Sequence, residues 1–179
     1  MPHVPPQPSP SRLTEFTAHP IVVGITPGQP ELVALTAASL ARATGAQLYF
    51  GFVDTSRITE EEYPDGTVRH SELNPDVVDD SWLDTQDEIE RFLTTVLADR
   101  GVTWHFRYLA GSPQRALTHL ARAVDAAAIV VATRAPGDGA QLREYFSESV
   151  AVRLTHHQHR PVVVVPLSVV DWKAKAPWD

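Results

Sequence analysis

The segment AAAIVVATRAPGDGAQLREYFSESVAVRLTHHQHRPVVVVP, residues 126–166, decides the fold. Its first part, Ala127–Thr133, is a nearly continuous apolar run, which is typical of a strand buried on both faces of a sheet. A loop with Gly and Pro follows, then a helix expected to begin near Ser147 or Ser149, and then a second apolar run, Val162–Val165. The segment therefore predicts two parallel strands joined by a right-handed helical crossover.

Ligands of open parallel sheets bind outside the carboxyl ends of the strands, often at a helix N-terminus. In residues 126–166 that place is the stretch 133–149, and we expect any ligand there. Ser147 or Ser149 is expected to cap the helix rather than to act as a nucleophile, because no GxSxG turn surrounds either residue.

The chain before this segment continues the same pattern of strands and helices. The third expected strand alternates apolar and polar residues, which predicts an edge strand with one buried face and one face in water. Gly45 is expected to end the first helix in a left-handed cap. Ser81 and Ser112 are expected to cap the next two helices. The expected strands are Pro20–Thr26, Gln47–Asp54 and Val102–Leu109, and the expected helices are Pro30–Thr44, Ser81–Arg100 and a third that begins after Ser112.

An unusually long connection, residues 55–80, separates the second strand from the second helix. Its Tyr63-Pro64-Asp65-Gly66 sequence has Pro and Gly where a tight turn needs them, and the flanking segments Arg57–Glu62 and Thr67–Glu72 predict a small hairpin. Thirteen of the 22 acidic residues lie between Asp54 and Glu90. Two interpretations stay open: an acidic lid over the strand ends that repels a triphosphate, or a solvated surface.

The segments IVVATRA, SVAVRL and RPVVVVP, together with IVVGITPGQPE, LYFGFVD and LAGSPQRALTHLA, resemble the universal stress protein family over roughly residues 20–166. The resemblance implies a Rossmann-like α/β fold: an open five-stranded parallel sheet of order 3-2-1-4-5 with helices on both faces, here with the hairpin inserted. It divides the chain into a disordered Pro-rich arm at residues 1–18, a domain at 19–166 and a tail at 167–179.

The resemblance also implies a site for ATP. Family members bind it with a loop of the form Gly, two residues, Gly, nine residues, Gly, then Ser or Thr. Here Ala132, Ala135 and Glu148 stand at the three glycine positions, with three extra residues between Ala135 and Glu148, and only the closing Ser149 is kept. At the second strand, Phe52 takes the place of a small residue that faces adenine, so its ring either stacks on a base or fills the pocket. The implied cofactor-binding residues are Ile25, Thr26, Phe52, Ala132, Arg134, Gly137, Gly139, Ser149 and Val150.

Composition excludes several classes of function. The chain of 179 residues has no cysteine, so it has no disulfide, thiolate metal site or cysteine nucleophile. Its net charge of -7 argues against binding to nucleic acid. No apolar run is long enough for a membrane span and no signal peptide is evident, so we expect a cytoplasmic protein. His156, His157 and His159 suit the end of a helix better than a metal site.

Two functions remain. The first is a non-enzymatic stress-response module, homodimeric, with weak or absent ATP binding and no required cofactor. The second is a nucleotide-binding or slowly ATP-hydrolysing protein whose Gly137 and Gly139 replace the lost glycines. The homodimer is expected through strand Pro161–Pro166, whose valines carry no charge. The tail, Leu167–Asp179, either reaches across to the partner or folds back over its own edge.

Overall fold

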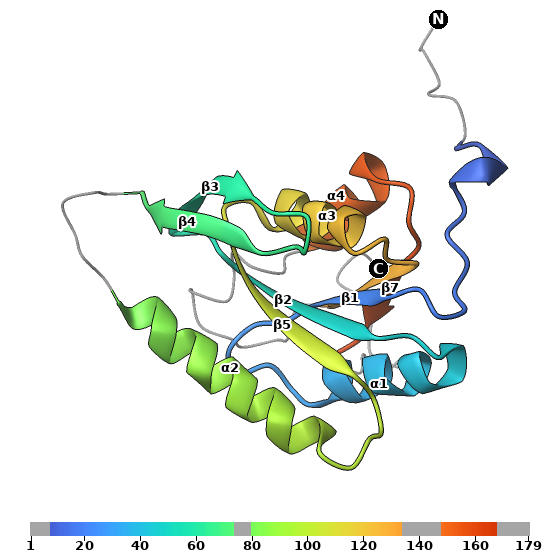
Figure 1. The fold of residues 1–179 in the computed structure, drawn as a ribbon, viewed down its shortest axis with the longest axis horizontal. Coiled ribbons are helices and arrows are strands. Elements are labelled where there is room, and N and C mark those ends of the chain that lie inside the picture. Colours follow the sequence, from blue (N-terminus) through green and yellow to red (C-terminus); the bar gives the residue numbers. More distant parts are fainter. Residues whose placement is uncertain (1–7, 74–79, 134–147, 168–179) are drawn as a thin grey trace, which may run out of the picture.

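A single parallel sheet forms the centre of the protein (Figure 1). The computed structural model describes residues 8–73, 80–133 and 148–167. The strands of the sheet lie in the order β5-β2-β1-β6-β7, and every neighbouring pair is parallel. This is the expected order 3-2-1-4-5, which is therefore confirmed. The strands are β1 (Ile21–Gly24), β2 (Leu48–Asp54), β5 (Trp104–Ala110), β6 (Ala128–Ala132) and β7 (Val162–Val165).

Helices cover both faces of this sheet. Figure 1 shows α1 (Leu32–Thr44) and α2 (Ser81–Leu97) below it, and α3 (Pro113–Ala123) and α4 (Glu148–His157) above it. Successive residues of the central strands point to opposite layers, so Val23 belongs to the core with α1 and α2 while Val22 belongs to the core with α3 and α4. Both are fully buried, which explains why the central strands are apolar without alternation.

The helix ends agree with the sequence at one position and differ at others. Gly45 has the expected left-handed conformation, with φ of 70°, and its N–H donates to the carbonyl of Ala41. The cap of α2 is Asp80, so the prediction for Ser81 is wrong by one residue, since Ser81 already has helical geometry. Ser112 does stand at the cap position of α3, but its hydroxyl makes no capping hydrogen bond.

The predicted hairpin is present. The strands β3 (Arg57–Glu62) and β4 (Val68–Glu72) pair antiparallel, with an irregularity between Thr59 and Glu61. The turn is closed by hydrogen bonds from the Tyr63 N–H to the Thr67 carbonyl, at 2.9 Å, and from the Gly66 N–H to the Tyr63 carbonyl, at 3.0 Å. The Tyr-Pro-Asp-Gly signal therefore specified both the turn and the two strands that flank it.

The hairpin lies along β5, with its open end beside the last residue of that strand, Ala110, and its turn beside Arg107, away from the strand ends. Its turn packs on the α3 layer, because a Cβ added to Gly66 would come 2.5 Å from Cδ1 of Leu120. Its open end reaches the α2 layer, where the rings of His70 and Trp82 lie 5.0 Å apart. The interpretation of residues 63–66 as an acidic lid over the strand ends is therefore wrong.

The same packing corrects the expectation for β5. The strand does lie at the edge of the sheet, as predicted, but its polar face is only partly in water. Arg107 is half-buried, with its guanidinium 5.3 Å from the ring centroid of Tyr49, and its Nε donates to the carbonyl of Asp65 in the hairpin turn at 3.2 Å. Of the polar residues in the alternating pattern, Arg107 thus serves as a contact for the hairpin, whereas Thr103 stays exposed.

At the N-terminus, residues 8–18 contain a short 3-10 helix, η1 (Pro10–Arg12), and no other element. The disorder expected for residues 1–18 and the two alternatives for the tail at 168–179 stay predictions. In the described part of the chain, no helix is both long enough and apolar enough to cross a membrane.

Candidate functional site

The carboxyl ends of the strands bring three of the expected cofactor-binding residues into one row. The pairing of β1 places Ile21 beside Leu48 of β2 and beside Ala128 of β6, so four residues later Ile25 is level with Phe52 and with Ala132. All three belong to the core on the α1 and α2 side. The row continues to Tyr108 on β5, which pairs with Phe52, and to Val165 on β7, which pairs with Ala132.

This row is densely packed. Ile25 is 2% exposed, while Phe52 and Ala132 are each 5% exposed. The ring of Phe52 lies 5.2 Å from the ring of Tyr108 in an edge-to-face arrangement, which is a favourable contact between aromatic rings. Phe52 is therefore a core residue in this structure, the second of the two roles expected for it.

The turn after β1 is closed by hydrogen bonds between its own residues. The N–H of Thr26 donates to Oε1 of Gln29 at 3.3 Å, and the N–H of Gln29 donates to the carbonyl of Thr26 at 3.2 Å. Both residues are buried, so the Gln29 amide satisfies a backbone group that would otherwise face the strand ends. The role of Gln29 was not predicted from the sequence, although a long amide side chain three residues after a strand end is a recognisable hydrogen-bond partner for a turn.

The remaining expected residues are only partly placed. Val150 lies in the first described turn of α4 and is 3% exposed, in the core on the α3 and α4 side. Ser149 is the second residue of α4. Arg134, Gly137 and Gly139 lie outside the described residues, so the expected glycine loop stays a prediction. The structure thus brings Ile25, Phe52 and Ala132 together on one face and puts Val150 on the other.

An aromatic cluster extends from the row to the hairpin and α2. The ring of Tyr108 lies 5.1 Å from His70 of β4 and 5.5 Å from Trp82 of α2, and its hydroxyl donates to Oδ2 of Asp54 at 2.6 Å. The sequence analysis missed this cluster. No periodicity places His70 beside Trp82 and Tyr108, because the contact depends on how the hairpin folds back.

The side chain of His70 accepts a hydrogen bond from Arg57, whose charge is permanent. Nε of Arg57 donates to Nδ1 of His70 at 2.8 Å, so Nδ1 must be unprotonated and the imidazole carries its proton on Nε2. Burial, and after it the positive charge of Arg57, lowers the pKa of His70 below its ordinary value of 6.5. Arg57 also contacts Glu72 at 3.4 Å and lies 5.8 Å from the ring of Trp82.

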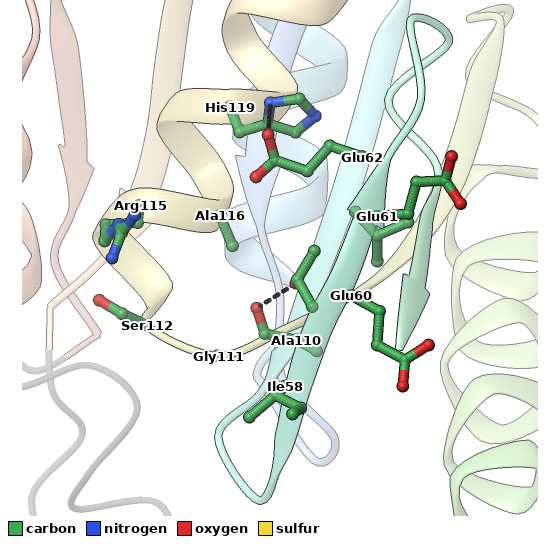
Figure 2. A pocket seen from close by; sticks show the side chains of 12 residues that line it. Ile58, Glu60, Glu61, Glu62, Ala110, Gly111, Ser112, Arg115, Ala116 and His119 are labelled. Carbon is green, nitrogen blue, oxygen red and sulfur yellow. Dashed lines mark hydrogen bonds and ion pairs between the residues drawn. The ribbon is translucent and has the colours of Figure 1, made fainter. Parts of the chain in front are cut away.

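A hollow of about 560 Å³ lies between β3 and the N-terminal half of α3 (Figure 2). At one end, Nδ1 of His119 lies 2.9 Å from Oε2 of Glu62, and nearby the hydroxyl of Thr59 donates to the carbonyl of Ala110 at 3.0 Å. Ser112 Oγ and His119 Nε2 are buried and have no hydrogen-bond partner among the described residues. Because neither atom is accessible to solvent, both are part of the wall of the hollow and neither can contact a ligand in it.

The acidic residues of the hairpin turn away from the row of Phe52. Figure 2 shows Glu60 and Glu61 on the side of β3 away from α3, and both pair with Arg69, at 3.1 and 3.6 Å. Glu62 points to His119. The arrangement favours the interpretation of a solvated surface. Among residues 8–73, 80–133 and 148–167, no three His, Asp or Glu side chains are grouped closely enough to hold a metal ion.

Comparison with known proteins gives one match by sequence family. The profile of the family described as "Universal stress protein family" matches residues 17–166. No curated protein matches the chain.

Several solved structures share the fold. A universal stress protein from Archaeoglobus fulgidus in complex with dAMP has 20% identity and a TM-score of 0.55, over 82% of this chain and 97% of that chain. A universal stress protein in complex with cAMP has 19% identity and a TM-score of 0.58, over 85% and 99%. The universal stress protein UspA from Lactobacillus plantarum has 14% identity and a TM-score of 0.58, over 83% and 98%.

Proposed function

This chain belongs to the universal stress protein family, and from that premise we propose that it is a homodimeric, non-enzymatic stress-response module whose nucleotide binding is weak or absent. The observation that carries the proposal is the packed row at the strand ends. Phe52 fills the space on the α1 and α2 side and is braced by Tyr108, so an adenine ring would have to displace a buried phenyl ring. Displacing a well-packed aromatic side chain costs free energy that the ligand must recover.

The loop sequence supports the same proposal. Glycine is used where a backbone approaches phosphate groups, because it has no Cβ to hold them apart. Ala132, Ala135 and Glu148 carry side chains at the three positions where the family has glycine, and the carboxylate of Glu148 adds a charge of the same sign as the phosphates.

The proposed homodimer uses the free edge of β7. In the described part of the chain β7 pairs with β6 alone, and Val164 is 42% exposed. A short uncharged edge strand favours pairing with a second copy about a two-fold axis, which closes the assembly. Pro161 and Pro166 flank the strand and limit the pairing to its four valines.

A second function is supported by the structural neighbours. Two of them hold dAMP and cAMP, which makes an adenine nucleotide the natural alternative ligand. In this alternative Gly137 and Gly139 supply the close approach to the phosphates, with slow ATP hydrolysis as a further step. The cytoplasmic location stays a prediction under either function.

Calorimetry separates the two functions. We expect the full chain to bind Mg-ATP with a Kd weaker than about 100 μM, corresponding to less than about 5.5 kcal/mol. Phe52→Val should strengthen binding, because it opens space in the row while placing a residue that strands favour at this position. Binding of Mg-ATP or cAMP by the wild type in the low micromolar range, or adenine nucleotide retained through purification, would replace the first function by the second.

A further inference from the structure

The hairpin is attached to the domain at two ends of different chemistry. At the turn end, Gly66 packs on Leu120 and Glu62 contacts His119 on α3. At the open end, His70 packs between the rings of Tyr108 and Trp82, at 5.1 and 5.0 Å. The two ends therefore anchor the hairpin to opposite layers of the fold.

Among the described residues, five side chains with charge or a titratable proton surround the open end. From β3, Arg57 donates to Nδ1 of His70 and Glu60 acts at longer range. From β4, Glu72 contacts Arg57. From β2 and β5 come the carboxylate of Asp54 and the hydroxyl of Tyr108, which are joined at 2.6 Å. The contact from α2 is the uncharged ring of Trp82.

The hydrogen bond between Arg57 and His70 exists in one protonation state only. Arg57 stays charged at any ordinary pH and can only donate. A proton on Nδ1 of His70 would place two donors 2.8 Å apart and bring two positive charges into a half-buried site. Since Asp54 and Glu60 act in the opposite direction but more weakly than burial and Arg57, their attraction does not offset that repulsion.

We propose that His70 is a proton-operated latch that holds the open end of the β3–β4 hairpin against β5 and α2. When His70 takes up a proton, the Arg57 bond breaks and the hairpin detaches at this end. Detachment exposes Tyr108, the residue that braces Phe52 in the row at the strand ends. The latch would therefore couple acidification to access at the strand ends, whether or not a nucleotide binds there.

The direction of the pH dependence follows from the lowered pKa of His70. The closed hairpin favours neutral His70, so its stabilisation is complete above the ordinary pKa of 6.5 and is lost as the pH falls from there through the lowered value. At the turn end, the packing of Gly66 on Leu120 involves no titratable group, so that contact does not depend on pH. Acid should therefore open one end of the hairpin and leave the other attached.

Hydrogen exchange on the full-length protein, followed by NMR, tests the latch. The Leu73 N–H donates to the Ser56 carbonyl at the open end, and the Tyr63 N–H donates to the Thr67 carbonyl at the turn. Between about pH 7.5 and about pH 5.5, the protection factor of Leu73 should fall by up to tenfold per pH unit over the titration window, while that of Tyr63 changes little. The Ile25 N–H, bonded to the Gly51 carbonyl within the main sheet, provides the internal standard.

Two variants test whether His70 causes the fall in Leu73 protection at low pH. His70→Asn keeps an acceptor oxygen near the position of Nδ1 but cannot titrate, so its Leu73 protection should change with pH no more than that of the Ile25 amide. His119→Asn, which changes the histidine at the other end, should keep the full response. An equal fall in His70→Asn, or no fall in the wild type while NMR shows His70 titrating, would overturn the proposal. The wild-type titration gives this answer even if a variant fails to fold.

Discussion

Replacing Gly66 by alanine tests whether the hairpin turn is packed on α3. Gly66 has φ of +82°, a conformation that residues with a Cβ rarely adopt. A Cβ at this position would also lie 2.5 Å from Cδ1 of Leu120, well inside van der Waals contact. The substitution therefore combines a backbone penalty with a steric penalty, and the two can be measured separately.

The magnitude follows from these two penalties. The left-handed backbone costs about 1–2 kcal/mol for a residue with a Cβ. Leu120 is fully buried in the core on the α3 side, so its methyl group must shift among packed neighbours to admit the new Cβ, and such overpacking adds about 1–3 kcal/mol. We expect Gly66→Ala to lower the free energy of unfolding by about 2–5 kcal/mol.

Gly101 provides the matched control. It has φ of +63°, and no atom lies within 4 Å of the position that a Cβ would take there, so Gly101→Ala carries only the backbone penalty of about 1–2 kcal/mol. Urea unfolding of both variants gives the steric penalty as a difference, and Leu120→Ala combined with Gly66→Ala should remove most of it. If Gly66→Ala costs no more than Gly101→Ala, the turn does not pack on α3 and the placement of the hairpin is wrong.

Three further predictions concern other parts of the molecule. Tyr108→Phe removes the hydrogen bond to the Asp54 carboxylate and should lower the free energy of unfolding by about 1–3 kcal/mol in urea titrations. Val164→Lys places a charge on the exposed edge of β7 and should halve the mass measured by light scattering without changing the circular dichroism; an unchanged mass of two chains would exclude this edge as the interface. Glu148→Gly removes a carboxylate from the expected phosphate loop and should tighten Mg-ATP binding in calorimetry; equal or weaker binding would contradict the proposed repulsion.

The strands and helices were predictable because their signals are local. Ala127–Thr133 is apolar without alternation, and that pattern requires burial on both faces, which the structure shows for Ala128–Ala132. Tyr63-Pro64-Asp65-Gly66 encodes its turn through fixed backbone preferences, so the hairpin strands followed from four residues. The strand order was available only through the family resemblance, because no local pattern states which strands are neighbours.

Contacts between distant segments could not be predicted from the sequence. The hydrogen bond of His70 with Arg57 and its ring contacts with Trp82 and Tyr108 depend on the direction in which the hairpin folds back. The alternation in β5 correctly predicts an edge strand, yet at Arg107 the solvent expected on the polar face is replaced by the hairpin, which supplies the Asp65 carbonyl. An alternating sequence pattern indicates that one face of a strand is polar, but it does not indicate whether water or protein covers that face.

The two edges of the sheet differ in whether another part of the chain covers them, and this difference affects how two copies could pair. The hairpin contacts the C-terminal half of β5, from Arg107 to Ala110, so a second chain cannot pair along this part of the edge without displacing it. The β7 edge, by contrast, pairs with β6 alone within the described residues and presents uncharged valines. Since an open sheet with one covered edge can grow only through the other, pairing of two copies through β7 uses up the last free edge and stops at the dimer. In the proposed homodimer, the β3–β4 hairpin would thus limit the assembly to two chains, independently of any ligand.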